Sequence, residues 1–178
     1  MERYQGKSIA WGIAEGKIFP YVKDRYQVEK IRKKDPEGEI ERYRRTEEEA
    51  IRQLGEAYDK AVEIVGARSA SLFEMQAMLL KEGHFREPVE QMIREMRVCA
   101  EYAVASQGRK LARACQQLTD ERERRTEADI RDISKRLLAL LSGQGYASPI
   151  GQEPVILMAR EISPGELLQM ERSLVLGL

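Results

Sequence analysis

Histidine and cysteine, the side chains most often used for acid–base and nucleophilic chemistry near neutral pH, are rare in this sequence of 178 residues, with one His and two Cys. His84 is the single histidine, and it lies in the stretch KEGHFR, which is typical of a loop between helices. It could act as a general base or accept a phosphate, but no glycine-rich or hydroxyl-bearing frame surrounds it. We therefore interpret His84 as a surface loop residue rather than the centre of an enzyme, and we predict no catalytic residue in this chain.

The two cysteines, Cys99 and Cys115, are too far apart in the sequence to form a C-x-x-C pair. A zinc site built from cysteine and histidine needs about four ligands at characteristic spacing. Two cysteines and one histidine cannot supply them, so we predict no metal site. Isolated cysteines in a highly charged chain indicate reduced thiols, which are typical of cytoplasmic proteins.

The charges of the sequence balance, because 30 basic side chains accompany 30 acidic ones. Proteins that bind nucleic acid, and proteins that bind membrane surfaces through basic clusters, usually carry an excess of positive charge. No apolar run approaches the roughly 18 residues that a membrane span requires, and the first residues lack the apolar stretch of a signal peptide. We therefore predict a cytoplasmic protein that binds neither nucleic acid nor a membrane.

One predicted helix carries more apolar side chains than a single core can accept. In residues 73–80, FEMQAMLL, Met75 and Met78 lie on a different helix face from Phe73 and Leu80. Exposed methionines adapt to many contact surfaces, so this face could dock a partner. A neighbouring helix could equally cover the methionines, and the pattern leaves both interpretations open.

The elements that must position these residues fall into three zones. Residues 1–33 contain short apolar pieces broken by glycines, near residues 9–11 and 17–22, which are typical of strands separated by turns. Residues 34–143 are highly charged and show helical periodicity, which indicates a bundle. Residues 144–178 return to turns and one compact apolar run, at 154–159, which predicts a buried strand.

Local signals mark where the predicted helices begin and end. Asp35 and Pro36 predict the cap and first residue of a long helix, and Gly66 predicts its end. The other expected limits are a second helix capped by Ser69 or Ser71 and broken by Gly83, a third beginning near Pro88, a fourth beginning near Ala100, and a fifth capped by Thr119 or Asp120 and ended by Ser142 and Gly143.

The expected fold class is mainly α, with a four-helix-type bundle inserted into a small α/β unit formed by the two ends of the sequence. The pattern does not prove that the ends pair, and a pure helical bundle with frayed ends is the alternative. If the second half of the α/β unit is missing, the strand at 154–159 would lack neighbours and present an exposed edge.

Several motifs, in this order and at this spacing, resemble enzyme I of the bacterial phosphoenolpyruvate-dependent sugar phosphotransferase system. Residues 6–17, GKSIAWGIAEGK, resemble its opening G-x-x-A-S-x-G-I-A-x-G, and residues 73–80 resemble its F-E-x-H-x-M-L-L helix. Residues 129–138, DIRDISKRLL, carry the most specific likeness, to D-x-R-D-I-x-K-R-L-L. The closing segments are similar to the family motifs V-I-L-x-A, L-T-P-S-E and V-L-G, at residues 154–159, 162–166 and 175–177.

The resemblance implies a helical subdomain, inserted into a phosphohistidine α/β domain, that docks the phosphocarrier protein HPr during phosphoryl transfer for sugar uptake. The sequence stops before the family's G-G-x-T-S-H stretch, which holds the phospho-accepting histidine, so the α/β part is expected to be incomplete. No cofactor is implied for these residues, because the family holds its magnesium on a separate C-terminal barrel. We expect part of a transferase that is inactive alone, and the sequence predicts no particular oligomeric state.

The resemblance also implies where HPr would dock, on the second helix and the loop after it, with help from the next long helix. The implied docking residues are Glu74, Met78, Leu79, Glu82, Phe85, Cys115 and Leu118. They would form an apolar centre with an acidic rim facing the basic surface of HPr. We expect binding on the order of micromolar or weaker, because a carrier must dissociate after each transfer.

Besides Trp11, which replaces a proline, three positions depart from the family pattern. Gln76 replaces a histidine of the docking helix, Arg68 stands where a carboxylate is common, and Thr126 stands where arginine is usual. A cation at position 68 would repel a basic partner. These departures favour the alternative of a divergent, stand-alone helical interaction module without phosphotransfer activity.

Overall fold

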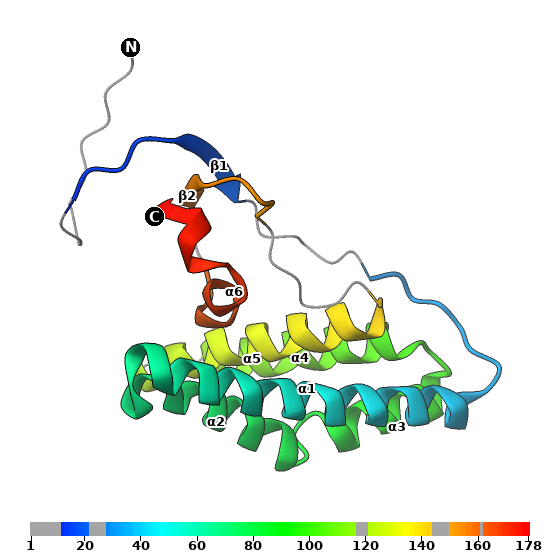
Figure 1. Ribbon diagram of the computed structural model, residues 1–178. Coiled ribbons are helices and arrows are strands. Elements are labelled where there is room, and N and C mark those ends of the chain that lie inside the picture. Colours follow the sequence, from blue (N-terminus) through cyan, green and yellow to red (C-terminus); the bar gives the residue numbers. More distant parts are fainter. Residues whose placement is uncertain (1–11, 22–27, 117–120, 144–149, 161) are drawn as a thin grey trace.

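The computed structural model describes residues 12–21, 28–116, 121–143, 150–160 and 162–178, and it describes residues 121–125 by their backbone alone. Within this part of the chain, five long helices follow one another between two paired strands (Figure 1). In chain order the elements are β1 (Lys17–Tyr21), α1 (Pro36–Val65), α2 (Ala67–Lys81), α3 (Arg86–Met96), α4 (Ala100–Gln116), α5 (Glu121–Leu141), β2 (Val155–Ala159), α6 (Pro164–Gln169), a 3₁₀ turn (Arg172–Leu174) and β3 (Val175–Gly177).

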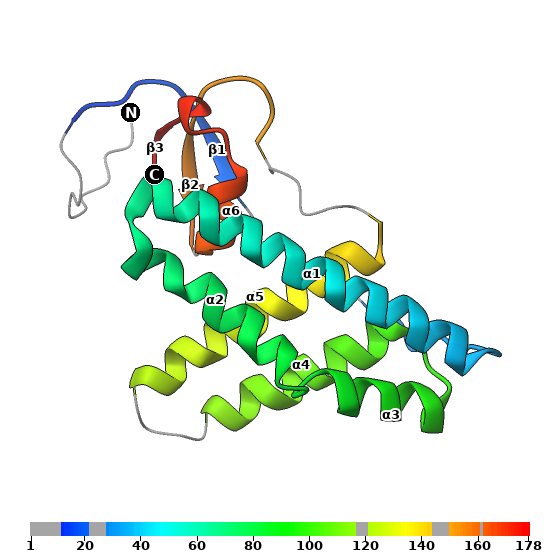
Figure 2. The same cartoon turned by 60° about the horizontal axis from the view of Figure 1, so that its bottom comes forward.

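The two ends of the sequence meet in a three-stranded parallel sheet with the order β1-β2-β3 (Figure 2). The register of the first pair runs from Lys17 opposite Val155 to Tyr21 opposite Ala159. This pairing confirms the expected fold class, a helical bundle inserted into a small α/β unit. Strand β2 has a neighbour on each side, so the prediction that it would present a bare edge is wrong.

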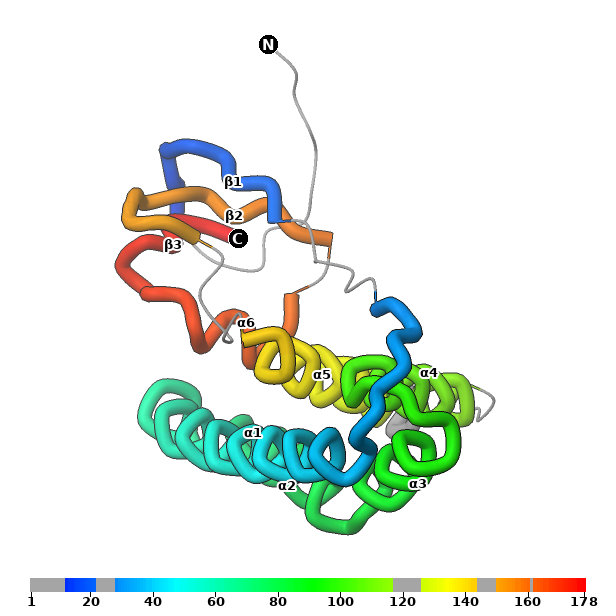
Figure 3. The backbone as a smooth tube through the Cα atoms, turned by 90° about the vertical axis from the view of Figure 1, so that its right-hand side faces the viewer, coloured from blue at the N-terminus to red at the C-terminus, as the bar shows by residue number. Residues whose placement is uncertain are grey.

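The helices form a bundle to one side of the sheet, and α6 lies between the two (Figure 3). Each part has its own apolar core. The larger core is formed by all five helices from α1 to α5, and its buried side chains include Tyr43, Leu54 and Leu137. The smaller core lies beside the sheet and contains Val155 and Leu157. The domain limits expected after residues 33 and 143 stay predictions.

The junction between α1 and α2 is tighter than the sequence suggested. Asp35 caps α1 by accepting a hydrogen bond from the Gly38 backbone N–H at 3.0 Å, as predicted. Gly66 ends α1 with a φ of 81°, but it also directly precedes α2. Because a glycine can turn the chain at this φ without strain, no loop is needed, and neither Ser69 nor Ser71 acts as a cap.

Other boundaries follow local signals to different degrees. Gly83 and Gly143, both with positive φ, follow the ends of α2 and α5 as expected. Helix α3 begins two residues before Pro88, because proline is tolerated throughout the first helical turn. Helix α6 and strand β3 are additional elements that the sequence pattern did not indicate. Thr119, Asp120 and the strand expected near residues 9–11 lie outside the described residues.

A buried polar cluster joins the bundle to the α/β unit. Lys135 of α5 forms an ion pair with Glu166 of α6, and the Tyr21 hydroxyl of β1 donates a hydrogen bond of 2.6 Å to the same carboxylate. Burial alone would raise the pKa of Glu166, but Lys135, the Ser163 backbone N–H and Tyr21 together hold this pKa below its usual range. The carboxylate therefore links three elements while remaining ionised.

We predict that replacing Lys135 by Met destabilises the fold mainly at neutral pH. The change leaves the Glu166 carboxylate buried without its cation, which should lower the free energy of unfolding by roughly 3 kcal/mol at pH 7. In the wild type the contribution of Glu166 is fully present above the usual carboxyl pKa and is lost as the pH falls through the lowered one. Urea unfolding at pH 7 and pH 4 should therefore show a smaller difference between the two proteins at the lower pH.

The matched control replaces Lys17 by Met, because Lys17 pairs with Glu153 on the surface, where both side chains are mostly exposed. An exposed pair of this kind contributes little to stability, because water and salt screen the two charges. Equal losses of stability in the two variants would contradict the assigned role of Lys135.

Candidate functional site

Helix α2 buries one face and leaves the other open. Phe73, Ala77 and Leu80 pack into the larger core. Met75 and Met78 on the opposite side are 56% and 53% exposed. The structure thus decides between the two interpretations of this helix, because no helix in the described residues covers the methionines.

Most of the predicted docking residues on α2 lie on or beside this open face. Glu74 and Glu82 are exposed, and they stand one turn before and one turn after Met78. Leu79 is half-buried and packs against the larger core. We use the name docking face for the exposed Glu74, Met75 and Met78 of α2, the half-buried Leu79, and the exposed Glu82 that caps the end of the helix.

Two of the predicted docking residues come later in the sequence. Cys115, near the end of α4, is half-buried and packs against the same core as Leu79. The Cys115 side chain is therefore only partly accessible to a partner. Leu118 lies outside the described residues.

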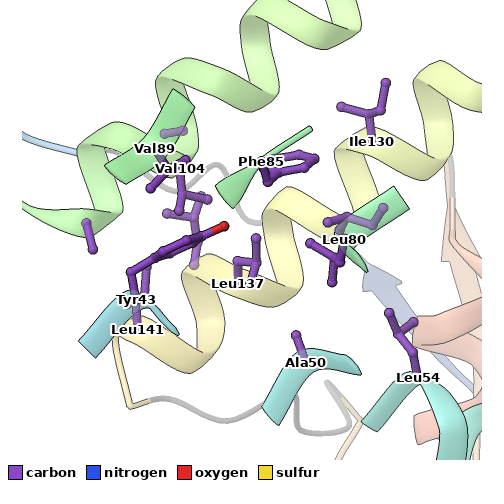
Figure 4. Close-up of a cluster of buried hydrophobic side chains, with 14 of the residues drawn as sticks. Tyr43, Ala50, Leu54, Leu80, Phe85, Val89, Val104, Ile130, Leu137 and Leu141 are labelled. Atoms are coloured by element: carbon purple, nitrogen blue, oxygen red, sulfur yellow. The ribbon is translucent and has the colours of Figure 1, made fainter. Parts of the chain in front are cut away.

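Phe85 does not lie on the surface, so the prediction that it contacts a partner is wrong. Its side chain is only 1% exposed and belongs to the cluster of buried side chains that includes Leu80 and Leu137 (Figure 4). The ring packs near Gly108 of α4, where a Cβ would meet it at an ordinary contact distance of 3.9 Å. The glycine instead makes room for Ser134 of α5, whose Oγ would clash with that Cβ.

The turn between α2 and α3 is fastened to the bundle at several points. Gln107 of α4 donates a hydrogen bond of 2.8 Å to the His84 carbonyl oxygen. Arg86 donates one of 2.5 Å to the fully buried carboxylate of Glu47, which also accepts a hydrogen bond of 2.8 Å from the Tyr43 hydroxyl. Burial and the nearby carboxylate raise the pKa of Tyr43, which keeps its hydroxyl protonated as a donor.

The remaining residues considered for catalysis or metal binding are exposed or lie apart from one another in the part of the chain that the structure describes. The His84 imidazole is exposed, with Nε2 3.4 Å from the Glu82 carboxylate, as expected of a surface loop histidine. Across the described residues, no three His, Cys, Asp or Glu side chains gather closely enough to hold a metal ion. None of the helices in that part of the chain is long and apolar enough to cross a membrane.

The three unusual positions occupy different layers of the bundle. Gln76 is buried, and its Nε2 donates a hydrogen bond of 2.9 Å to the Asp129 carboxylate of α5. This substitution therefore alters the layer beneath the docking face, not the face itself. Arg68 is exposed on the first turn of α2, and Thr126 is half-buried on α5.

The sequence is similar to a known family of domains and to curated proteins. The family model described as PEP-utilising enzyme, N-terminal, matches residues 5–124. The phosphoenolpyruvate-protein phosphotransferase of Listeria monocytogenes is 26% identical over 174 residues, which cover 97% of this chain and 30% of the relative. The corresponding protein of Buchnera aphidicola from Acyrthosiphon pisum is 31% identical over 169 residues, which cover 93% of this chain and 30% of the relative.

Two solved structures share the fold. The NMR solution structure of Enzyme I (nEIt) matches with a TM-score of 0.71 and 29% identity, over 91% of this chain and 66% of the other. The N-terminal domain of Enzyme 1 - Nitrogen matches with a TM-score of 0.70 and 22% identity, over 91% of this chain and 67% of the other. The chain spans about 30% of the length of the curated relatives it matches.

We predict that replacing Asp129 by Asn leaves the fold at least as stable at pH 7. Burial raises the pKa of Asp129, and the hydrogen bond from Gln76 offsets only part of this effect. An acid with a raised pKa gains stability as the pH falls through that pKa, so its charge is a cost at neutral pH. Asparagine keeps the acceptor oxygen without the charge, and a gain of about 1 kcal/mol is expected at pH 7.

Urea unfolding between pH 7 and pH 5 tests this, with Asp59→Asn on the exposed surface of α1 as the control. The Asp129 variant should show a weaker pH dependence than the control. A loss of stability at pH 7 that exceeds the loss in the control would show that the charge of Asp129 is needed for the fold.

Proposed function

The chain belongs to the family of PEP-utilising enzyme N-terminal domains, and from this membership we propose that it docks HPr, the phosphocarrier of the sugar phosphotransferase system. In this role it would be the HPr-recognising portion of an enzyme I that passes a phosphoryl group toward sugar uptake. The curated relatives named phosphoenolpyruvate-protein phosphotransferase, which it matches over nearly its whole length, support the proposal.

The single observation that carries the proposal is the pair of exposed methionines on α2. Large apolar side chains are seldom left uncovered side by side, and Met75 and Met78 are both more than half exposed. Their flexible side chains adapt to a partner without demanding one exact shape. Leu79 beside them packs against the larger core, which holds the centre of the proposed contact in position.

The charges around the methionines supply the rim of the proposed contact. Glu74 and Glu82 are exposed on the same side of α2, where they would face the basic surface expected of HPr. The turn that carries Glu82 is held rigidly by Gln107 and Arg86, so little order has to be gained on binding. A small apolar centre with an exposed rim suits a weak, rapidly reversible complex.

We predict that replacing Met78 by Asp weakens HPr binding by about tenfold or more, because the charge must be desolvated at the centre of the contact. The measurement is a calorimetric titration of the chain with HPr from the same organism. The titration is run with and without EDTA, and we expect no difference because the proposed contact uses no metal ion.

The control is Met96→Asp, which introduces the same charge at an exposed methionine near the end of α3. It should change the affinity by less than about twofold. If the wild-type chain shows no saturable binding at about 1 mM HPr, or if both variants bind equally weakly, the proposal is wrong. The interaction module that serves a different partner would then be the better account.

We predict that replacing Arg68 by Glu increases both stability and HPr affinity. Arg68 is the second residue of α2, whose first turn holds no acidic side chain, and a carboxylate there should add about 0.3–1 kcal/mol by its interaction with the helix dipole. The same carboxylate would attract the basic surface of HPr.

Thermal unfolding and the HPr titration measure the two effects separately. Arg160→Glu, at an exposed position after β2, controls for the change in net charge. A rise in melting temperature without a gain in affinity over the control would show that the partner does not present cations to this part of α2.

A further inference from the structure

The sheet has an apolar face that none of the described elements covers. Phe19 and Leu157 pack into the smaller core, and the side chains next to them along the strands point to the opposite side. On that side Ile18 is 64% exposed and Met158 is 58% exposed. The bundle and α6 lie together on one side of the sheet (Figure 3), so they leave these side chains open.

The sequence of the central strand does not match this one-sided cover. Strand β2 reads VILMA and is apolar at each of its five positions. Parallel sheets are normally covered on both faces, and their strands are then continuous apolar runs. In β2, however, Val155 and Leu157 are buried whereas Met158 is exposed. The strand therefore has the sequence of one that is covered on both faces.

The exposed apolar side chains form one continuous patch. In the register of β1 and β2, Ile18 lies beside Ile156, and paired residues of parallel strands point to the same side. Leu176 of β3 reaches the same place, because a Cβ at Gly16 would lie 2.8 Å from Leu176 Cδ1 and 3.9 Å from Ile156 Cγ1. We use the name outer sheet face for the set Ile18, Pro20, Ile156, Met158 and Leu176.

The outer sheet face carries no charge. Lys17, which precedes it on β1, has its charge matched by Glu153 at 2.9 Å. The sequence as a whole has a formal net charge of zero, so two copies of the chain do not repel each other at long range. A charged partner would find no opposite charge on this face, whereas a second uncharged apolar face matches it. Another copy of the chain supplies such a face.

We propose that two copies of the chain associate by packing their outer sheet faces together about a two-fold axis. In this arrangement the same surface serves on both copies, so the contact closes at two chains. The two sheets would lie about 10 Å apart, as in other face-to-face sheets. Strand β2 would then be covered on both faces, as its sequence indicates.

The size of the outer sheet face sets the strength of the association. Strands β1 and β2 have five residues each. With the usual spacing between strands, three strands of this length form a face of roughly 10 by 16 Å. Stable complexes bury about 800 Å² on each partner, so we expect a weak dimer with a Kd of about 0.1 mM. Helix α2 is not part of this face, so the inference goes beyond the proposed function and does not depend on it.

Sedimentation equilibrium of the chain between about 10 µM and 1 mM tests the proposal. The apparent mass should rise from that of one chain to that of two and no further. Replacing Met158 by Lys should weaken the association about tenfold or more, because the contact would bury a charge. The matched control is Met75→Lys on α2, where the methionine is 56% exposed and the change in charge is the same. It should leave the association unchanged.

Three results would overturn the inference. The first is a wild-type chain that stays monomeric at about 1 mM, and the second is a mass that grows beyond two chains. The third is loss of association in Met75→Lys but not in Met158→Lys, which would place the contact on the docking face instead. None of these measurements uses HPr, so the proposed function is tested separately.

A second measurement does not depend on how a variant folds. Wild-type chain labelled with carbon-13 at its methyl groups is mixed with an equal amount of unlabelled chain at about 1 mM, and NOEs between the two copies are recorded. The contacts should involve the methyl groups of Ile18, Met158 and Leu176. NOEs confined to Met75 and Met78, or to the exposed Ile64 near the end of α1, would contradict the proposed arrangement.

Discussion

A helix that packs against a single core can bury only one of its faces. The proposed docking of a partner on α2 depends on this constraint. Phe73, Ala77 and Leu80 fix the helix to α1 and α5, which forces Met75 and Met78 outward. No described element covers them. The rest of the bundle holds this arrangement in place, from the glycine turn before α2 to the fastened turn after it.

Charges are used in two distinct ways. Inside, Lys135 with Glu166 and Arg86 with Glu47 join elements that meet from distant parts of the sequence. These pairs are costly to break because each leaves a buried charge without its partner. Outside, Glu74 and Glu82 stand exposed beside the methionines of the docking face. The contrast separates residues that hold the fold from residues that face a partner.

Features that depend on neighbouring residues could be predicted from the sequence, whereas most contacts between distant residues could not. Asp35, Gly66 and Gly83 could be read as helix limits, because caps and positive φ depend on the residue itself. The burial of Phe85 could not, since it depends on the shared core that Val104 and Leu137 bring from distant parts of the sequence. Glu47 gave no signal either, because a carboxylate within a run of glutamates looks exposed until Arg86 and Tyr43 are placed around it. Strand β3 is too short for its pattern to stand out.

The central claim is that the open side of α2 is a recognition surface for HPr, and cross-saturation NMR tests it most directly. Unlabelled HPr is irradiated in complex with the deuterated, nitrogen-15-labelled chain. The account predicts saturation of amides in residues 74–82, which cover the second half of α2 and its C-cap, with none in residues 90–96 of α3. Saturation confined to α3 or to the sheet, or the absence of any transfer from a saturating amount of HPr, would contradict it.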